Sequence, residues 1–180
     1  MKLAVLALGA VLLAACGRTN VQDYQAAEPR LDLARYFNGN LTGWGMVQDR
    51  SGRVLRRFTV EMVATWSGNT GVLAENFQWS DGKTEFRRWA IVKNGDTYQG
   101  TAGDVVGSAA GHAAGNTLQW RYVLALPVDG ATWEMQMDDW MYLIDEDTLV
   151  NRTRMSKFGV QMAEISIFFR RQHTPQTPPG

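Results

Sequence analysis

Residues 118–143 read LQWRYVLALPVDGATWEMQMDDWMYL, and this stretch decides the fold. Large apolar side chains occupy alternate positions on both sides of Asp129-Gly130: Leu118, Trp120, Tyr122, Leu124 and Leu126 before it, and Trp133, Met135, Met137, Met141 and Leu143 after it. Alternation with a period of two places these side chains on one face of a β-strand, whereas a helix repeats about every 3.6 residues. An Asp-Gly pair is a common turn between antiparallel strands. The stretch therefore predicts a β-hairpin with one buried face.

The same alternation extends through most of the chain. It is clear in residues 54–66, where Val54, Phe58, Val60, Met62, Ala64 and Trp66 share a face, and in Ile165, Ile167 and Phe169. Turn-forming pairs separate the runs, namely Ser51-Gly52, Ser67-Gly68, Asp81-Gly82 and Asn94-Gly95. This spacing is typical of hairpins joined in series. We expect eight to ten strands, at about 42–49, 53–66, 71–80, 83–93, 97–101, 104–112, 116–126, 131–144, 148–157 and 160–170.

A long antiparallel meander can remove its unpaired edges by closing on itself. The predicted fold is therefore an all-β, antiparallel up-and-down β-barrel of 8–10 strands, wide enough to enclose one small ligand. Residues 31–39, LDLARYFNG, predict a short N-terminal helix that ends at Gly39. We expect this helix to cap one end of the barrel, because its apolar side chains have no partner of their own.

The N-terminus has the layout of an export signal. Lys2 is followed by an apolar run from Leu3 to Leu13, then by Ala14, Ala15 and Cys16, the single cysteine of the chain. The run is shorter than the ~20 residues that a membrane-spanning helix needs. This pattern predicts a signal peptide over residues 1–15.

The sequence Leu13-Ala14-Ala15-Cys16 resembles the lipobox of bacterial lipoproteins. The resemblance implies that Cys16 is the lipid attachment site and carries acyl chains such as palmitate, several of which make a stable membrane anchor. Gly17 follows the cysteine, and by resemblance to lipoprotein sorting a residue other than Asp implies the outer membrane. We expect the protein in the cell envelope, anchored to the membrane through this lipid and facing the periplasm.

The rest of the chain divides by composition. Residues 16–30 are polar and end at Pro29-Arg30, which predicts a lipid-anchored tether. Residues 172–180 hold three of the five prolines and predict a disordered tail. Residues 31–171 are left as one β-barrel domain.

Charge and motif content exclude several functions. Without residues 1–15 the chain has 17 basic and 18 acidic side chains, which argues against nucleic-acid partners. With Cys16 acylated no thiol remains, and the two histidines, His112 and His173, lack neighbours for a metal site or a catalytic triad. No nucleophile elbow, HExxH, Walker loop or dinucleotide fingerprint is present. We therefore expect no metal, no cofactor and no assigned catalytic residue; the oligomeric state stays open.

Residues 138–159 are the densest polar stretch and predict a second hairpin, which turns at 145–147. If Ile144 pairs with Thr148, Asp138 opposes Arg154 and Trp140 opposes Arg152, which suits an ion pair and a cation–π contact. The opposite face, which is rich in Met and Leu, becomes the interior and carries Met137, Asp139, Met141, Asn151 and Thr153. A shift of one residue would invert the two faces.

These five residues, together with Trp44 and Phe58, are the candidates for lining an interior ligand pocket. Asp139, Asn151 and Thr153 would form a polar cluster inside an apolar cavity, where a carboxylate needs partners or becomes protonated. The cluster is either a satisfied hydrogen-bond network or a polar handle for a ligand head group, or for acid–base chemistry.

Four glycines, Gly103, Gly107, Gly111 and Gly115, are spaced four residues apart. On a strand they would share a face, and strand glycines mark bends or the close approach of something bulky. The bulky group is either a neighbouring Trp or a ligand.

Three blocks of sequence resemble a known family. They are TGWGMV at 42–47, a Gly-rich block with a following LQWRYVL at 103–124, and DDWMYLID to MSKFG at 138–159. Over about 31–171 they resemble a proteobacterial lipoprotein family of unknown function, domain-of-unknown-function family 3833. The resemblance implies lipoprotein export and a calycin or lipocalin-like barrel, although Gly43 and Trp44 are adjacent here and separated by one residue in the lipocalin signature. It carries over no activity, but members are often encoded beside fatty-acid-modifying enzymes, which implies a lipid link.

The sequence thus favours an outer-membrane lipoprotein whose periplasmic barrel binds a hydrophobic or amphipathic small molecule, such as a lipid or fatty-acid derivative. Met-rich inner faces suit flexible acyl contacts. Two alternatives stay open: an enzyme that acts on a lipid with an interior carboxylate, and a cell-envelope interaction protein without a pocket, in which aromatic side chains fill the barrel.

Overall fold

Residues 118–143 form the predicted hairpin. Strands β7 (Thr117–Val128) and β8 (Ala131–Leu143) pair in antiparallel register, with Leu118 opposite Met141 and Leu126 opposite Trp133. Asp129 and Gly130 between them have φ angles of 49° and 81°. Positive φ at both central residues fits the tight turn whose twist matches that of the two strands.

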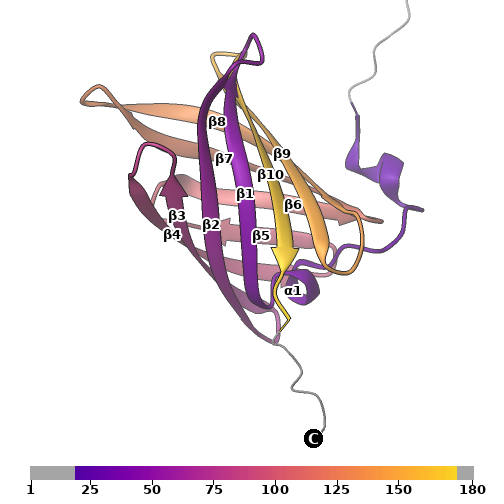
Figure 1. Ribbon diagram of the computed structural model, residues 1–180. Helices are drawn as coiled ribbons and strands as arrows, with labels where there is room; N and C mark the ends of the chain where they lie inside the picture. Colours follow the sequence, from indigo (N-terminus) through magenta and orange to yellow (C-terminus); the bar gives the residue numbers. More distant parts are fainter. Residues whose placement is uncertain (1–18, 174–180) are drawn as a thin grey trace, which may run out of the picture.

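The computed structural model describes residues 19–173, and within them ten antiparallel strands close into a barrel (Figure 1). The remaining elements are β1 (Gly39–Asp49), β2 (Val54–Ser67), β3 (Thr70–Trp79), β4 (Thr84–Asn94), β5 (Thr97–Thr101), β6 (Val105–Ala114), β9 (Thr148–Lys157), β10 (Val160–Arg171), a 3-10 turn η1 (Val21–Tyr24) and a helix α1 (Leu33–Tyr36). The strand ends lie within about three residues of the predicted ones. Cys16, the predicted signal peptide over residues 1–15, and most of the predicted tail lie outside the described residues.

The barrel closes between the first and last strands. β1 pairs with β2 on one side and with β10 on the other, so that Gly43 lies opposite both Val60 and Phe169. Each strand from β2 to β9 pairs with its two sequence neighbours. Every strand of the described barrel therefore has a partner strand on both sides, and the predicted all-β, up-and-down barrel is confirmed.

The inner face of β1 carries glycines instead of large side chains. A Cβ atom on Gly43 would lie 2.7 Å from Val60 Cγ1 and 2.9 Å from Phe169 Cδ1, and the Phe58 ring lies over Gly45. Side chains from β2 and β10 therefore fill the space inside β1. Trp44, between the two glycines, points outward, is 47% exposed and packs near Phe168 with ring centroids 6.3 Å apart. The prediction that Trp44 lines the interior is wrong.

The short helix caps one end of the barrel, called here the closed end. It spans four residues instead of the predicted nine, and Leu31, Leu33, Tyr36 and Phe37 are all buried in the main core. Trp66 Nε1 on β2 donates a hydrogen bond of 2.7 Å to the Phe37 carbonyl. The predicted position of the helix, over one end of the barrel, is confirmed.

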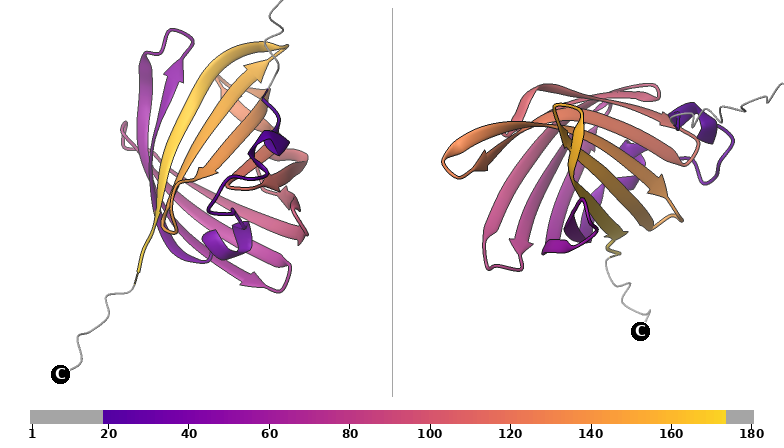
Figure 2. Two further views of the ribbon diagram at one scale, coloured as in Figure 1. Left: turned by 90° about the vertical axis from the view of Figure 1, so that its right-hand side faces the viewer. Right: turned by 90° about the horizontal axis from the view of Figure 1, so that it is seen from above.

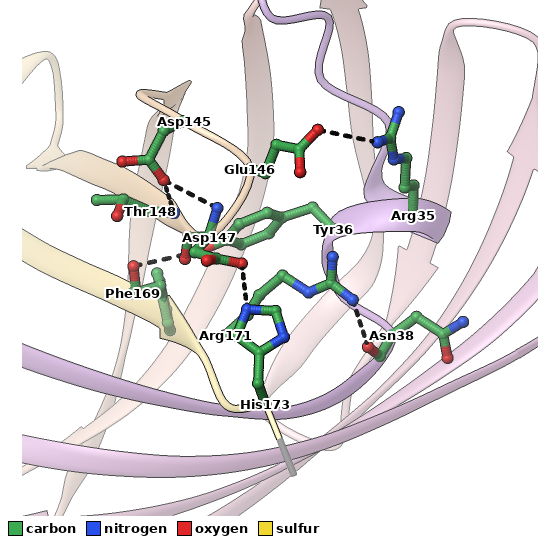
Figure 3. Close-up of polar contacts among 10 residues, drawn as sticks. All are labelled: Arg35, Tyr36, Asn38, Asp145, Glu146, Asp147, Thr148, Phe169, Arg171 and His173. Carbon is green, nitrogen blue, oxygen red and sulfur yellow. Dashed lines mark hydrogen bonds and ion pairs between the residues drawn. The ribbon is translucent and has the colours of Figure 1, made fainter. Parts of the chain in front are cut away.

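Polar contacts fasten the closed end to the β8–β9 turn (Figure 3). The Tyr36 hydroxyl lies 3.1 Å from the Asp147 carbonyl and 3.2 Å from the Phe169 carbonyl. Arg35 forms an ion pair of 3.5 Å with Glu146, and His173 Nε2 lies 2.7 Å from Asp147 Oδ1. Helix, turn and the end of β10 are thereby joined.

Residues 19–30, called here the N-terminal strap, lie against the outer wall of the barrel (Figure 2). Val21 is buried, and the Tyr24 ring packs on Trp140 and Tyr142 of β8, with centroids 6.3 and 5.7 Å away. The Leu31 amide donates to the Gly115 carbonyl at 2.8 Å. This part of the predicted tether is therefore packed on the barrel. Within residues 19–173, no helix is long and apolar enough to cross a membrane.

The glycine series has two kinds of neighbour. The Trp120 ring lies directly against Gly111, and the Tyr24 carbonyl lies against Gly115, whereas a Cβ on Gly103 or Gly107 would meet nothing within 4 Å. The bulky group that approaches the series is thus protein: a neighbouring Trp and the backbone of the strap.

Candidate ligand-binding site in the barrel interior

Packed side chains fill only part of the barrel interior. Between the closed end and the opposite rim lies a cavity of about 270 Å³, bounded by side chains from β1 to β4 and from β7 to β10, with Leu33 and Phe37 at its closed end. Small-molecule sites in proteins commonly measure ~300–1,000 Å³. The cavity therefore suits a small ligand, or the enclosed part of a larger one.

The walls are mainly apolar and rich in aromatic rings. Phe58 and Trp79 pack with ring centroids 4.8 Å apart on one side, and Trp89 and Trp120 pack at 5.7 Å on another. Met141 on β8 adds flexible, polarizable surface. Such walls contact apolar ligand groups without requiring a fixed shape.

The second predicted hairpin has the expected register. Asp139 lies opposite Thr153, Met141 opposite Asn151, and the Ile144 amide donates to the Thr148 carbonyl at 2.9 Å. Among the predicted pocket residues, the cavity is lined by Phe58, Asp139, Met141, Asn151 and Thr153.

Met137 faces inward but does not line the cavity. It is buried in a second cluster with Leu124, Met135, Met155 and Ala163. Its side chain therefore packs in the interior beside the cavity. The prediction that Met137 lines the pocket is wrong.

On the outer face of the same hairpin the register is as predicted, but the partners differ. Asp138 Oδ1 lies 3.2 Å from Arg121 Nε on β7 instead of pairing with Arg154. Arg152 forms a two-bond ion pair with Glu164 on β10, at 2.8 Å for each bond. Each of these two side chains therefore pairs with a charge on the strand outside the hairpin, β7 for Asp138 and β10 for Arg152.

Strands β3 and β4 contribute polar interior residues that the sequence analysis missed. Glu75 on β3 lies opposite Arg87 on β4 in register, and both line the cavity. Arg87 donates from Nη2 and Nε to Asp104 Oδ2, at 2.7 and 2.9 Å. We call Glu75, Arg87, Asp104, Tyr122 and Asp139 the interior polar cluster.

A signal for these residues was present in the sequence. Glu75 stands in phase with Leu73 and Phe77, and Arg87 stands in phase with Trp89 and Ile91, all of which face inward. A charged residue at an apolar position of an alternating strand indicates a buried polar group.

Two carboxyl groups of the cluster are buried without a full set of hydrogen bonds. Glu75 is 8% exposed and Asp139 is 6% exposed. Among the described residues, Glu75 Oε2 and Asp139 Oδ1 have no hydrogen-bond partner, and the same holds for Asp104 Oδ1 and for Arg56 Nε. Thr153, beside Asp139, donates instead to Asn151 Oδ1 at 3.1 Å. Buried polar atoms of this kind are rare in folded proteins and call for a partner.

Burial changes the acidity of both groups. Loss of solvation raises the pKa of Glu75 to about 7, although the positive charge of Arg87 acts in the opposite direction. Loss of solvation likewise raises the pKa of Asp139 to about 7, against the smaller effects of Thr153 and Arg87. Both carboxyls can therefore gain or lose a proton near neutral pH.

The two histidines lie away from the cavity. His112 Nε2 is 2.7 Å from Gln22 Nε2 of the N-terminal strap, and His173 contacts Asp147 at the closed end. Within residues 19–173, no group of three or more His, Cys, Asp or Glu side chains is arranged to hold a metal ion. The chemistry that the site offers is apolar contact, hydrogen bonding and proton exchange by carboxyl groups.

Residues 10–171 match the family described as Protein of unknown function (DUF3833). No curated protein matches the sequence. The crystal structure of Rv2717c from M. tuberculosis is similar, with a TM-score of 0.57 and 16% identity, over 82% of this chain and 99% of that one. A de novo designed fluorescence-activating beta barrel gives a TM-score of 0.40 with 21% identity, over 79% of this chain and 99% of that one. The likeness to Rv2717c shows a shared barrel fold.

Proposed function

Because the chain belongs to the DUF3833 family, which has no assigned activity, we propose a function from the interior of the barrel: it binds a hydrophobic or amphipathic small molecule. The observation that carries this proposal is the cavity of about 270 Å³, whose apolar walls surround two carboxyl groups with unpartnered oxygens. Ligand sites typically combine such walls with a few polar groups that fix orientation.

Native mass spectrometry of protein purified from its own host tests this proposal. We expect a bound, organic-extractable mass that unfolding releases. A neutral fluorescent probe, N-phenyl-1-naphthylamine, should bind the emptied protein. Ile165→Trp places a larger side chain in the cavity and should weaken probe binding. Ser166→Trp, on the outer face of β10, should not weaken it. Equal binding by both variants would contradict an interior site.

Of the two alternatives, the interaction protein without a pocket is disfavoured by the cavity. An enzyme that acts on a lipid remains the second candidate, because a carboxyl with a pKa near 7, such as that of Asp139, suits general acid–base catalysis. An enzyme would release a chemically altered product from a supplied lipid, while a binding protein would return it unchanged, and mass spectrometry distinguishes the two results.

We further propose that the protein is a lipoprotein anchored through Cys16 in the outer membrane and facing the periplasm, where its ligand would be a lipid or fatty-acid derivative. Support comes from the sequence Leu13-Ala14-Ala15-Cys16 and the Gly17 that follows. Cys16→Ser should abolish incorporation of labelled palmitate and release the protein from membrane fractions. Unchanged fractionation would reject the anchor, and recovery of wild type in the inner membrane would reject the location alone.

A further inference from the structure

The cavity holds two acidic groups on opposite parts of its wall. Glu75 projects from β3 and Asp139 from β8, and each has one carboxyl oxygen without a hydrogen-bond partner among the described residues. An unmade hydrogen bond at a buried oxygen is destabilising, because the oxygen has lost its contact with water and gained no partner. A ligand that donates hydrogen bonds would give these carboxyl oxygens the partners that they lack.

The cations of the cavity wall are already engaged. Arg87 donates twice to Asp104, with bonds of 2.7 and 2.9 Å. Arg56, near the rim, bonds to Asp81 at 2.9 Å and stacks 4.0 Å over the Trp79 ring. Each arginine of the wall therefore already has a carboxylate partner, although the buried Arg56 Nε has no acceptor among the described residues.

The other charged or titratable groups that face Glu75 and Asp139 do not reverse this balance. Two of these groups, Arg87 and Glu85, lie on β4. Asp104 precedes β6, Tyr122 lies on β7, and Asp138 lies next to Asp139 on β8 but faces outward. The two arginines of the wall are paired, Arg87 with Asp104 and Arg56 with Asp81, whereas the carboxyls of Glu75 and Asp139 have no cationic partner within hydrogen-bond distance. An anion brought into this low-dielectric space would be opposed by charges of its own sign.

From these contacts we propose that the cavity selects an amphiphile whose head group donates hydrogen bonds, such as an alcohol, an amide or an amine, and that it excludes free carboxylates. This inference rests on the proposed function and narrows its ligand class. The apolar part of the ligand would lie against the aromatic walls, and its donor would reach Glu75 Oε2 or Asp139 Oδ1.

Three probes of equal chain length, decanol, decylamine and decanoate, test the inference by displacement of N-phenyl-1-naphthylamine. The full chain with Cys16→Ser, which cannot be acylated, allows the measurement without detergent. At pH 8 we expect decanol and decylamine to bind at least roughly tenfold more tightly than decanoate, because decanoate ionises near pH 4–5 and would enter as an anion. Decylamine binding should tighten as the pH rises from 6 to 8, because the carboxyls become ionised, while decanoate binding should weaken.

Two isosteric variants locate the effect. Glu75→Gln and Asp139→Asn, singly and together, should raise the affinity for decanoate and lower that for decylamine at pH 8. Asp138→Asn, the same change one residue away on the outer face, should alter the ratio of the two affinities far less, because the Asp138 charge is the smallest of the effects on the pKa of Asp139. Should the double variant fail to fold, the two single variants carry the comparison.

The outcomes separate this inference from the proposed function. Decanoate binding at pH 8 as tight as that of decanol, or a ratio insensitive to both Glu75→Gln and Asp139→Asn, overturns the head-group selection and leaves small-molecule binding intact. Failure of N-phenyl-1-naphthylamine and of all three amphiphiles to bind, at pH 6 and at pH 8, overturns both.

Discussion

Asp138 and Asp139 are adjacent on β8 and have opposite environments. Asp138 faces outward, where Gln119 Nε2 donates to it at 2.6 Å and Arg121 Nε at 3.2 Å. Asp139 faces the cavity with Oδ1 unpartnered within the described part of the chain. The sequence left open a satisfied network or a functional role, as a polar handle for a ligand or in acid–base chemistry, and the unpartnered oxygen favours a functional role. The pair provides a matched test of buried and exposed carboxylates.

Asp139→Asn should change how stability depends on pH. The carboxyl of an unfolded chain ionises near pH 4, while burial raises the pKa of Asp139 to about 7, so between these values the folded state retains a proton that the unfolded state has lost. The free energy of unfolding should therefore fall as pH rises from 4 to 7, by on the order of 1 kcal/mol per pH unit for each such group, and then level off. Urea denaturation at pH 5 and pH 8 measures this slope.

Asp139→Asn should remove the Asp139 share of that slope and raise the stability at pH 8. It should also reduce the Glu75 share slightly, because the Asp139 charge contributes to the raised pKa of Glu75. Asp138→Asn should keep nearly the whole slope of the wild type, because the Asp138 charge is the smallest of the effects on the pKa of Asp139. A loss of more than ~1 kcal/mol at pH 8 in Asp139→Asn, in protein free of ligand, would instead assign Asp139 to a satisfied structural network.

Glycines opposite aromatic rings are the second residue-scale feature. A Cβ on Gly111 would overlap the buried Trp120 ring, whereas one on Gly103 would meet nothing within 4 Å. Gly111→Ala should lower the free energy of unfolding by ~1–3 kcal/mol, the usual effect of overpacking a core. Gly103→Ala, at an ordinary φ angle, should change it by less than ~0.5 kcal/mol. Thermal or urea denaturation compares the two, and equal losses would contradict the overpacking explanation.

At the scale of elements, alternation predicted the strands well because each strand has one buried and one exposed face. The register of β8 and β9 was also predictable, since the turn at 145–147 fixes it. The sequence failed at β1, where the inward positions are Gly43 and Gly45 and the conspicuous Trp44 faces out. Which neighbour fills a glycine gap depends on tertiary packing, and no local pattern reports it.

The candidate site was predictable only in part for a related reason. Two strands of one hairpin placed Asp139, Asn151 and Thr153 together, whereas Glu75 and Arg87 come from β3 and β4, on a distant part of the wall. Glu75 and Arg87 face the same cavity as Asp139 only because the barrel closes. Closure also decides which inward residues border empty space and which, like Met137, are packed.

Tyr36→Phe tests how the helix is fastened to the closed end. The Tyr36 hydroxyl lies between the carbonyls of Asp147 and Phe169, and its ring is almost fully buried (Figure 3). Removing the hydroxyl should lower the free energy of unfolding by ~1–2 kcal/mol, because buried carbonyls lose a donor. Arg35→Ala, which breaks only the exposed ion pair with Glu146, should cost less than ~1 kcal/mol. Urea denaturation of both variants compares them; similar losses would mean that the hydroxyl does not hold the helix.

At the scale of the whole molecule, closure makes β10 the element that completes the barrel. It pairs with β9 on one side and β1 on the other, from Leu41 opposite Arg171 to Asp49 opposite Ala163. It also contributes Ile165, Ile167 and Phe169 to the cavity wall. Loss of this strand would expose two strand edges and open the cavity together.

Truncation measures that dependence. A chain that ends at Gly159 lacks β10 and should show no cooperative thermal transition, and it should aggregate because β1 and β9 become free edges. A chain that ends at His173 keeps the strand, the Gln172–Asn40 hydrogen bond of 2.8 Å and the His173–Asp147 contact, and should unfold within a few degrees of the full chain. Circular dichroism melting distinguishes the two; a folded, monomeric chain ending at Gly159 would contradict the role of closure.

The packing of the N-terminal strap sets how freely the barrel could move on a membrane. Val21 and Tyr24 fix the strap to the wall, so on the proposed anchor at Cys16 only about four residues separate the lipid from the first fixed point. From Cys16 to Val21 the chain makes five residue steps, which span at most roughly 18 Å when fully extended. This connecting segment is thus shorter than the longest strands of the barrel, which exceed ten residues. The barrel would then stay within the length of this segment from the bilayer, and only some of its faces could turn toward the membrane. A ligand that left the cavity would therefore already be close to lipid.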